Sequence, residues 1–203
     1  MGSKAWQLGS PGTWIYRFYD GLRERLNHKL VRFLAESALT RNRCTVLEAG
    51  SGPAFASSLL AVDPRVELSV AVDIDMEALQ EARLRDPHLA AVVADLQHLP
   101  LRAESFDLCW NSSTIEHLDD PGGALSHMAR VTRRSGKVFV GVPYLYGPLG
   151  LQRWIADTSV GVWVGPTFSR EELTQMMLQT GLKPAKTIFY FFRFFVGVLA
   201  EKS

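Results

Sequence analysis

The 203-residue sequence has only two cysteines, no long apolar run and almost no net charge. Cys44 and Cys109 fall in segments that we expect to be buried strands, so we expect small core residues rather than a disulfide framework. This use of cysteine is typical of a reducing cytoplasm, which is the location we expect. No group of His, Cys and Asp residues has the spacing of metal ligands, and we expect no metal site.

The balance of charge and the apolar content exclude further classes of protein. The 22 basic and 21 acidic residues give a net charge of +1, which is no reason to expect a nucleic acid or an anionic membrane as partner. The most apolar stretch, residues 187–200, contains Arg193 and is shorter than the roughly 18 residues of a membrane span. No signal peptide is visible at the N-terminus. With 47% hydrophobic residues, the sequence predicts one α/β domain over residues 1–203.

A strand–turn–helix signature stands at residues 45–54, with the sequence T-V-L-E-A-G-S-G-P-A. A short apolar strand ends at Glu48, glycines turn the chain, and Pro53 suits a first helical turn. This arrangement brings backbone N–H groups to a nucleotide-like ligand, although it can also be a plain turn. Phe55 occupies the place where a nicotinamide dinucleotide site needs a small residue, which argues against that cofactor. A carboxylate at Glu48 can attract an ammonium group.

Segments of strand type alternate with helical patterns along most of the chain, which predicts a Rossmann-like, doubly wound sheet. We expect a mostly parallel sheet with an antiparallel C-terminal strand, in three layers α/β/α. A capping box at 169–172 opens the last helix, and a strand pair turns near Arg193. The expected elements are a helical cap at 14–40, strands at 45–48, 68–75, 90–94, 106–111 and 137–143, helices at 55–61 and 76–85, and a helix from Pro121 that Gly136 stops.

Further motifs follow the other predicted strands. Asp73 ends the second strand 21 residues after Gly52, where a carboxylate can accept both hydroxyls of a ribose or simply shape a turn. E-A-G-S-G at 48–52, Asp73, D-L-Q-H-L-P at 95–100 and S-F-D-L-C-W-N…E-H-L at 105–118 together resemble the class I S-adenosylmethionine-dependent methyltransferases. The chain is most similar to their small-molecule, methyltransferase-domain type 11-like branch, which includes quinone-ring C-methyltransferases.

The resemblance implies that the cofactor is S-adenosyl-L-methionine and that S-adenosyl-L-homocysteine is the product. It places the turn of Gly50, Ser51 and Gly52 beside the methionine part of the cofactor, with Glu48 beneath it organising the ammonium group. It also places Asn111, at the end of the fourth strand, between the methionine end and the acceptor.

The same resemblance implies the contacts of the adenosine part. Asp73 would hold the ribose hydroxyls and Ile74 would pack on one face of the adenine. Asp95 would accept from the adenine amino group, and the backbone of Leu96 would meet the edge of the ring. One departure is that Ala71 and Val72 precede Asp73, where the family often has a glycine.

Methyl transfer from a sulfonium is an in-line displacement, so the protein must align the acceptor and exclude water. A base is optional. His117 is the candidate, because a histidine titrates near neutral pH and this one follows the fourth strand. A packing or surface histidine is the open alternative.

Residues 144–168 have no clear period but are rich in apolar and aromatic side chains. We expect them to fold over the site as a lid that binds a small apolar or aromatic acceptor, through Tyr144, Tyr146, Trp154 and Trp163. A homodimer contact is the alternative for this segment. For the whole chain, a cofactor- or partner-binding protein without transfer activity, or another nucleotide-using Rossmann enzyme, stays open.

Overall fold

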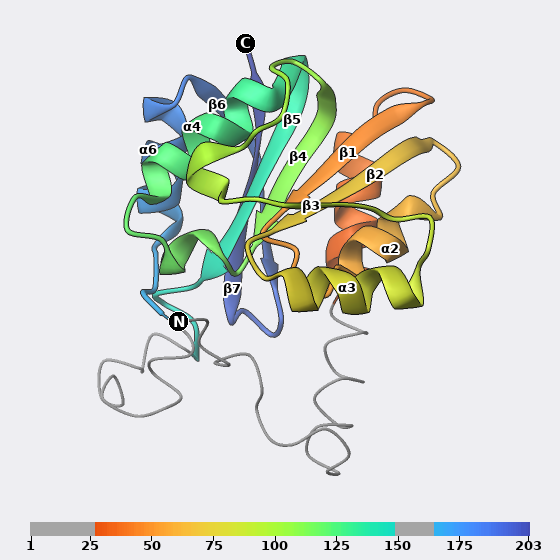
Figure 1. Ribbon diagram of the computed structural model, residues 1–203. Helices are drawn as coiled ribbons and strands as arrows, with labels where there is room; N and C mark the ends of the chain where they lie inside the picture. The colour runs from red at the N-terminus through yellow and green to blue at the C-terminus, as the bar shows by residue number, and fades with distance from the viewer. Residues whose placement is uncertain (1–26, 149–164) are drawn as a thin grey trace.

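Seven strands form one sheet through the middle of the protein, with helices on both of its faces (Figure 1). The computed structural model describes residues 27–148 and 165–203. Along the sheet the strands follow the order β3-β2-β1-β4-β5-β7-β6. Their bounds are Cys44–Ala49 (β1), Val66–Asp73 (β2), Ala90–Val93 (β3), Phe106–Ser112 (β4), Thr132–Pro143 (β5), Leu182–Tyr190 (β6) and Phe195–Lys202 (β7).

The first five strands pair in parallel, whereas β7 is antiparallel to both β5 and β6. Parallel neighbours need a crossover connection, and helical segments supply it between the early strands. Strands β6 and β7 need only a short turn at residues 191–194, so they form a hairpin. The predicted mostly parallel sheet with an antiparallel C-terminal strand is confirmed.

Alternating side chains of β1 divide the core between the two faces of the sheet. Leu47 belongs to the core beneath α4 and α6. Val46 belongs to the opposite core, beneath a helix over residues 27–38 and α2, while α3 packs on Ala71 of β2. The three predicted layers are therefore present. The helix bounds are Phe55–Ala61 (α2), Met76–Arg85 (α3), Pro121–Val131 (α4) and Arg170–Gln179 (α6), and two single 3-10 turns are Leu96–His98 (η1) and Ile115–His117 (η2).

Three of the helices begin at side-chain caps, and the capping box at 169–172 is the one predicted above. Asp75 accepts backbone N–H groups from the first turn of α3, and Asp120 does the same for α4, where Pro121 is the first helical residue. Ser169 and Glu172 form both hydrogen bonds of a capping box at α6. These local signals determine where the helices start and hence which strand ends remain open to a ligand.

Two predicted boundaries are wrong. Helix α4 ends at Val131 and β5 begins at the next residue, so Gly136 lies within a strand instead of stopping a helix. A Cβ at Gly136 would lie 2.7 Å from the Thr132 side chain, and the β4–β5 register shifts at this place, so the glycine permits a bulge. Strand β2 ends at Asp73, which leaves Ile74 beyond the strand rather than inside it.

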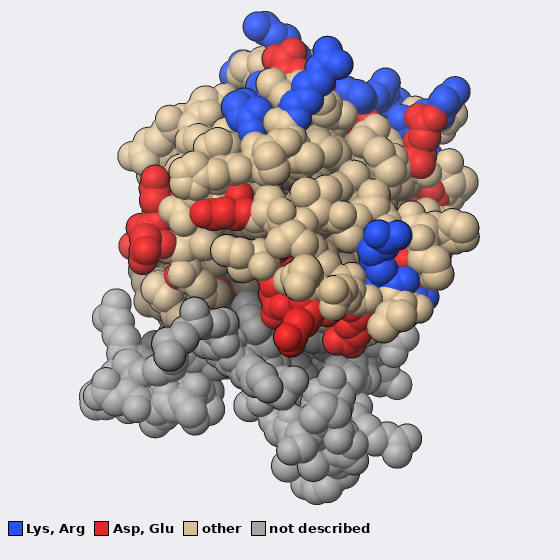
Figure 2. Space-filling model, viewed as in Figure 1, with Lys and Arg blue, Asp and Glu red and all other residues tan. Residues whose placement is uncertain are grey.

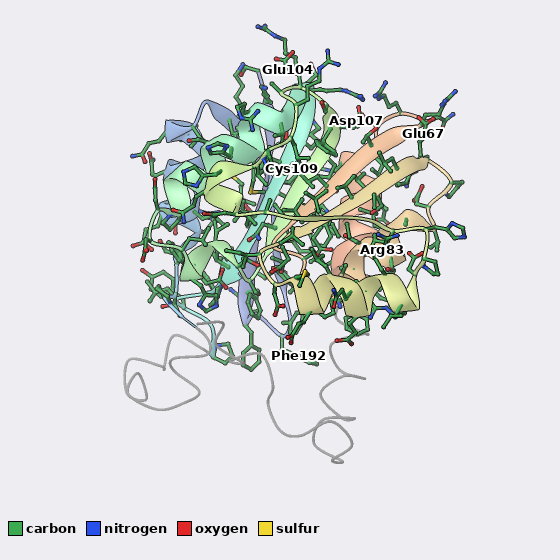
Figure 3. The ribbon with its side chains drawn as sticks, in the orientation of Figure 1. Glu67, Arg83, Glu104, Asp107, Cys109 and Phe192 are labelled. Atoms are coloured by element: carbon green, nitrogen blue, oxygen red, sulfur yellow. The ribbon has the colours of Figure 1, made fainter. Side chains whose placement is uncertain are left out.

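The two cysteines are buried, unbridged residues of the sheet, as expected for small core side chains. Figure 3 shows Cys109 near the middle of β4. Within residues 27–148 and 165–203, no helix has the length and hydropathy needed to cross a membrane.

Candidate functional site

The candidate site lies where the carboxyl ends of β1, β2 and β4 meet. The strand order reverses between β1 and β4, because the chain leaves β1 towards β2 and β3 and returns to place β4 on the other side. In open α/β sheets, ligands bind at the carboxyl edge beside such a switch point. The residues that the sequence predicts for the cofactor are either among the last residues of strands or in the segments that directly follow, at this edge (Figure 1).

The glycine turn after β1 is closed on one side and open on the other. The N–H groups of Gly50 and Ser51 donate to the carbonyl oxygen of Val72, at 2.7 and 3.0 Å. A Cβ on Gly50 would lie 2.5 to 2.7 Å from three atoms of the Thr114 side chain, whose Oγ1 donates to the Gly50 carbonyl at 3.0 Å. Around Gly52, by contrast, a Cβ would meet no atom of the described residues within 4 Å. A ligand can therefore approach the backbone at Gly52.

Asp73 joins the turn after β1 to the turn after β2. Its Oδ2 accepts the N–H of Gly52 at 2.6 Å and its Oδ1 accepts the N–H of Asp75 at 2.9 Å. Each carboxylate oxygen has a further lone pair. The carboxylate is thus held in a fixed orientation with acceptor capacity left for a pair of hydroxyl groups.

Glu48 lies beneath the glycine turn, on the α2 side of the sheet. Its Oε2 accepts from the backbone N–H of Ser57 at 3.0 Å and from the Ser57 hydroxyl at 2.5 Å. The pKa of Glu48 is raised to about 8, chiefly by burial and to a smaller extent by the charge of Asp73, and the hydrogen bonds from Ser57 oppose this rise. Glu48 therefore carries a proton at neutral pH in the cofactor-free protein.

The residues predicted for the adenosine part lie in the loops after β2 and β3. The Ile74 side chain is 71% exposed, an unusual place for isoleucine, while Leu96 is buried in η1. Asp95 caps η1 by accepting the N–H of Gln97 at 2.8 Å, and its other oxygen lies 3.3 Å from Nδ1 of His98. The hydrogen bond at Gln97 is the largest cause of the lowered pKa of Asp95.

Asn111 and His117 lie on either side of the η2 turn. Asn111 is fully buried: its Nδ2 donates to the carbonyl oxygen of Ala49, and its Oδ1 accepts the N–H of Ile115 at 3.3 Å. Its amide therefore fastens η2 to the end of β1. The backbone at Gly165 packs on the His117 ring, and partial burial lowers the pKa of His117.

The predicted lid is only partly within the described residues. Tyr144 is buried and makes an edge contact with Tyr146, with ring centroids 5.8 Å apart, while Tyr146 is 72% exposed. Trp154 and Trp163 lie outside the described residues. Figure 3 shows that Phe192, in the β6–β7 turn, lies at the carboxyl edge of the sheet as well.

Sequence reasoning missed three residues of this site. Thr114 clamps the glycine turn, Glu116 is buried in η2, and the hydroxyl of Tyr190 lies 2.8 Å from that of Ser112. The signal for Glu116 is its place in the E-H-L motif, directly before His117. Among the described residues, no group of His, Cys, Asp and Glu could hold a metal ion.

Comparison with known proteins shows which family and fold the chain is similar to. The model of a family described as a methyltransferase domain matches residues 47–140, which contain the glycine turn, Asp73, Asp95 and η2. Residues 47–140 are by this match a domain of the class I S-adenosylmethionine-dependent methyltransferases. The cofactor of this family is S-adenosyl-L-methionine.

Individual relatives agree with this family. A probable S-adenosylmethionine-dependent methyltransferase of Mycobacterium tuberculosis is 33% identical over 144 residues, covering 68% of this chain and 50% of the relative. The chain therefore spans about half the length of that relative.

Two solved structures are similar in fold. A chain from the complex between the Haloferax volcanii Trm112 methyltransferase activator and a putative methyltransferase has a TM-score of 0.76 at 18% identity, covering 90% of this chain and 92% of its own. Geranyl diphosphate C-methyltransferase from Streptomyces coelicolor has a TM-score of 0.71 at 15% identity, covering 97% of this chain and 85% of its own.

The residues present fit the cofactor of the family. The open side of Gly52 leaves space where another residue would carry a side chain. Asp73 has unused lone pairs for ribose hydroxyls, and the exposed Ile74 offers an apolar surface for an adenine ring. Phe55 follows in α2, where a dinucleotide site would need a small residue.

The raised pKa of Glu48 predicts how stability changes with pH. The folded protein keeps this proton until about pH 8, whereas the unfolded chain loses it near pH 4.5, so stability is full below pH 4.5 and falls as the pH rises towards 8. We expect the Glu48→Gln variant to lose about 2–4 kcal/mol less of its free energy of unfolding than the wild type over this pH range. Urea unfolding at both ends of this range measures it.

Glu67→Gln is the matched control for that experiment, because Glu67 is an exposed carboxylate paired with Arg43, which lowers its pKa. This variant should keep the loss of stability seen in the wild type. Equal pH slopes for the wild type and the Glu48 variant would contradict the assignment of a bound proton to Glu48.

Proposed function

We propose that this protein transfers the methyl group of S-adenosylmethionine to a small, apolar or aromatic acceptor. The observation that carries the proposal is the carboxylate of Asp73, which is fixed by Gly52 and Asp75 beside the open face of the glycine turn. A carboxylate held in this way is suited to two neighbouring hydroxyl groups, the distinctive feature of a ribose.

Named residues would hold the parts of the cofactor. The turn of Gly50, Ser51 and Gly52 would contact the methionine part through its backbone, with Glu48 beneath the ammonium group. Asp73 would hold the ribose. Ile74, the backbone of Leu96 and the carboxylate of Asp95 would hold the adenine.

When bound, S-adenosylmethionine supplies an activated methyl group on a sulfonium, so the protein need not generate a reactive species. The residues of the protein bind the cofactor, orient the acceptor and exclude water. Asn111 and Thr114 fix η2 to the glycine turn, which holds the acceptor side of the site against the cofactor side. Alignment of this kind can contribute roughly 7–11 kcal/mol to a displacement.

The distribution of charge supports a small acceptor rather than a nucleic acid. Figure 2 shows acidic side chains gathered at the lower edge and basic side chains at the opposite end of the molecule. Asp73, Asp75 and Glu77 follow β2 at the carboxyl edge of the sheet. An acidic edge attracts a cofactor with a sulfonium and an ammonium group, and it repels phosphates.

Aromatic side chains at the same edge support an apolar or aromatic acceptor. Tyr146 and Phe192 are both exposed, from the segment after β5 and from the β6–β7 turn. A single exposed apolar side chain is common on a protein surface, whereas exposed aromatic side chains gathered at one edge are typical of an interaction site. Trp154 and Trp163 remain part of the proposed lid, and a homodimer contact remains the alternative for these side chains.

Tyr146→Ala should raise the KM for the acceptor by about tenfold and leave cofactor affinity unchanged, because the variant removes aromatic contact area only. Leu84→Ala, which removes an equally exposed apolar side chain from α3, is the control and should change neither quantity. If Tyr146→Ala instead converts a dimer to a monomer in sedimentation and keeps full activity, the lid interpretation fails and the dimer alternative holds.

The activity itself is tested with S-adenosylmethionine carrying a deuterated methyl group and a library of small aromatic and apolar compounds. Mass spectrometry should detect a labelled product that depends on the protein. If calorimetry shows tight cofactor binding but no compound of a broad library is labelled, the second candidate, a binding protein of the same fold, is favoured.

A further inference from the structure

A buried acidic side chain in the candidate site has no partner on another described residue. Glu116, in η2, is 3% exposed. Neither of its carboxyl oxygens makes a hydrogen bond to another residue within the part of the chain that the structure describes, and only its own backbone N–H favours the carboxylate. Burying a carboxylate without a partner is costly, so a buried carboxyl group of this kind requires an explanation.

Glu116 is fixed to the glycine turn through its neighbours. Thr114 precedes η2 and donates to the Gly50 carbonyl at 3.0 Å, and Asn111 bridges the Ala49 carbonyl and the N–H of Ile115. These bonds tie the η2 turn to the end of β1. The turn therefore moves with the backbone that would carry the methionine part of the cofactor, which includes the sulfonium.

The surroundings of Glu116 contain little charge. Tyr190 of β6 is a titratable group that interacts with Glu116. Burial raises the pKa of the Tyr190 hydroxyl, the hydrogen bond with Ser112 lowers it, and the charge of an ionised Glu116 would raise it. His117 follows Glu116 in the same turn. The charged groups of α4 and β5 interact with residues other than Glu116. In α4, Arg130 donates to the carbonyls of Leu99 and Leu101, and His127 interacts with His98 and Asp95. In β5, the ion pairs are Arg133 with Asp107, Arg134 with Glu104 and Lys137 with Glu201.

We propose that Glu116 is protonated in the cofactor-free protein, releases this proton when S-adenosylmethionine binds, and then accepts the proton of the acceptor. This inference rests on the proposed function. Burial raises the pKa of Glu116 to about 8, opposed in part by its own backbone N–H. A sulfonium cation nearby favours the carboxylate and reverses this shift. A thioether carries no charge and leaves the proton in place.

The charges balance at each stage of this scheme. Glu116 takes the proton from the acceptor atom as a new bond joins that atom to the methyl carbon. The carbon–sulfur bond breaks with its electron pair on sulfur. A sulfonium and a carboxylate thus become a neutral thioether and a neutral carboxyl group, so the buried site never holds an isolated charge. The acceptor class is one that loses a proton, such as a hydroxyl, an amine or an acidic C–H, and not a carboxylate.

The test compares the binding of S-adenosylmethionine and S-adenosylhomocysteine by calorimetry near neutral pH, in phosphate and in Tris. The two buffers have different heats of ionisation, so the comparison counts the protons released. The ligands share the ammonium group and differ at sulfur, which cancels any contribution of Glu48. The wild type should release about one proton more with S-adenosylmethionine. Glu116→Gln should abolish this difference, and His117→Gln should keep it.

The pH dependence of the wild type gives an independent reading if the Glu116 variant does not fold. The affinity for S-adenosylmethionine relative to S-adenosylhomocysteine should rise by up to about tenfold per pH unit below pH 8 and then level off. Equal proton release by the two ligands, or a difference that His117→Gln abolishes, would overturn the assignment of Glu116. Failure of both ligands to bind would instead refute the proposed function.

Discussion

Asp73→Asn is expected to weaken the binding of S-adenosylmethionine and S-adenosylhomocysteine by about 10- to 100-fold, since hydrogen bonds to a charged group contribute roughly 1.5–3 kcal/mol. The carboxylate accepts from the backbone of Gly52 and of Asp75 in the absence of cofactor, and it has lone pairs left for a ribose. An amide keeps the shape of the side chain but replaces one acceptor oxygen with an NH2 donor. This group cannot accept the Gly52 N–H or the proton of a ribose hydroxyl.

Asp75→Asn is the control for this prediction. Asp75 lies at the same edge and carries the same charge, but its side chain caps α3 instead of facing the glycine turn. It should leave the affinity nearly unchanged, because asparagine is also a good helix cap. Calorimetry gives the affinities, and thermal unfolding shows whether the Asp73 variant keeps its fold. Full affinity in a folded Asp73→Asn protein would remove Asp73 from the cofactor site.

Gly50→Ala is expected to destabilise the fold by about 2–4 kcal/mol. Its φ of 77° is one that alanine rarely adopts. The added Cβ would also lie 2.5 to 2.7 Å from the Thr114 side chain, which is held in place by its bond to the Gly50 carbonyl. Relief of the overlap would push η2 away from the turn. The variant should therefore lose stability and cofactor affinity together.

Gly52→Ala separates these two effects. Gly52 also has a positive φ, 49°, but a Cβ there meets no atom of the described residues within 4 Å. It should cost only about 1 kcal/mol of stability, while its methyl group fills the space proposed for the cofactor and abolishes tight binding. Urea unfolding and calorimetry on both variants test the contrast. Equal stability losses in the two variants would contradict the different roles of the two glycines.

The sequence predicted the elements that depend on local chemistry. Caps at Asp75, Asp120 and Ser169 act within a few residues, so the starts of three helices could be predicted from those side chains alone. The parallel order followed from alternating strand and helix patterns. For the same reason, the motif residues at strand ends could be expected to share one edge of the sheet.

Other features depend on contacts between distant segments and could not be predicted. Gly136 looks like a helix stop, but it lies in a bulge of β5 that the pairing with β4 requires. The strand pair that turns near Arg193 was predicted, but the conformation of its turn was not, because Phe191, Phe192 and Arg193 all have positive φ without a glycine to indicate it.

The burial of polar side chains also depends on contacts between distant segments. The E-H-L motif does not show whether Glu116 is buried, whereas the packed sheet encloses this side chain. Likewise, the sequence does not show that the amide of Asn111 is buried between Ala49 and Ile115. The position of Asn111 beside the acceptor stays a prediction.

The position of the cofactor is tested most directly by a crystal structure of the complex with S-adenosylhomocysteine. We expect the ligand to cross the carboxyl ends of β1, β2 and β3, with both ribose hydroxyls on Asp73 and the adenine between Ile74 and Leu96. A ligand bound elsewhere, or one whose ribose does not touch Asp73, would contradict it.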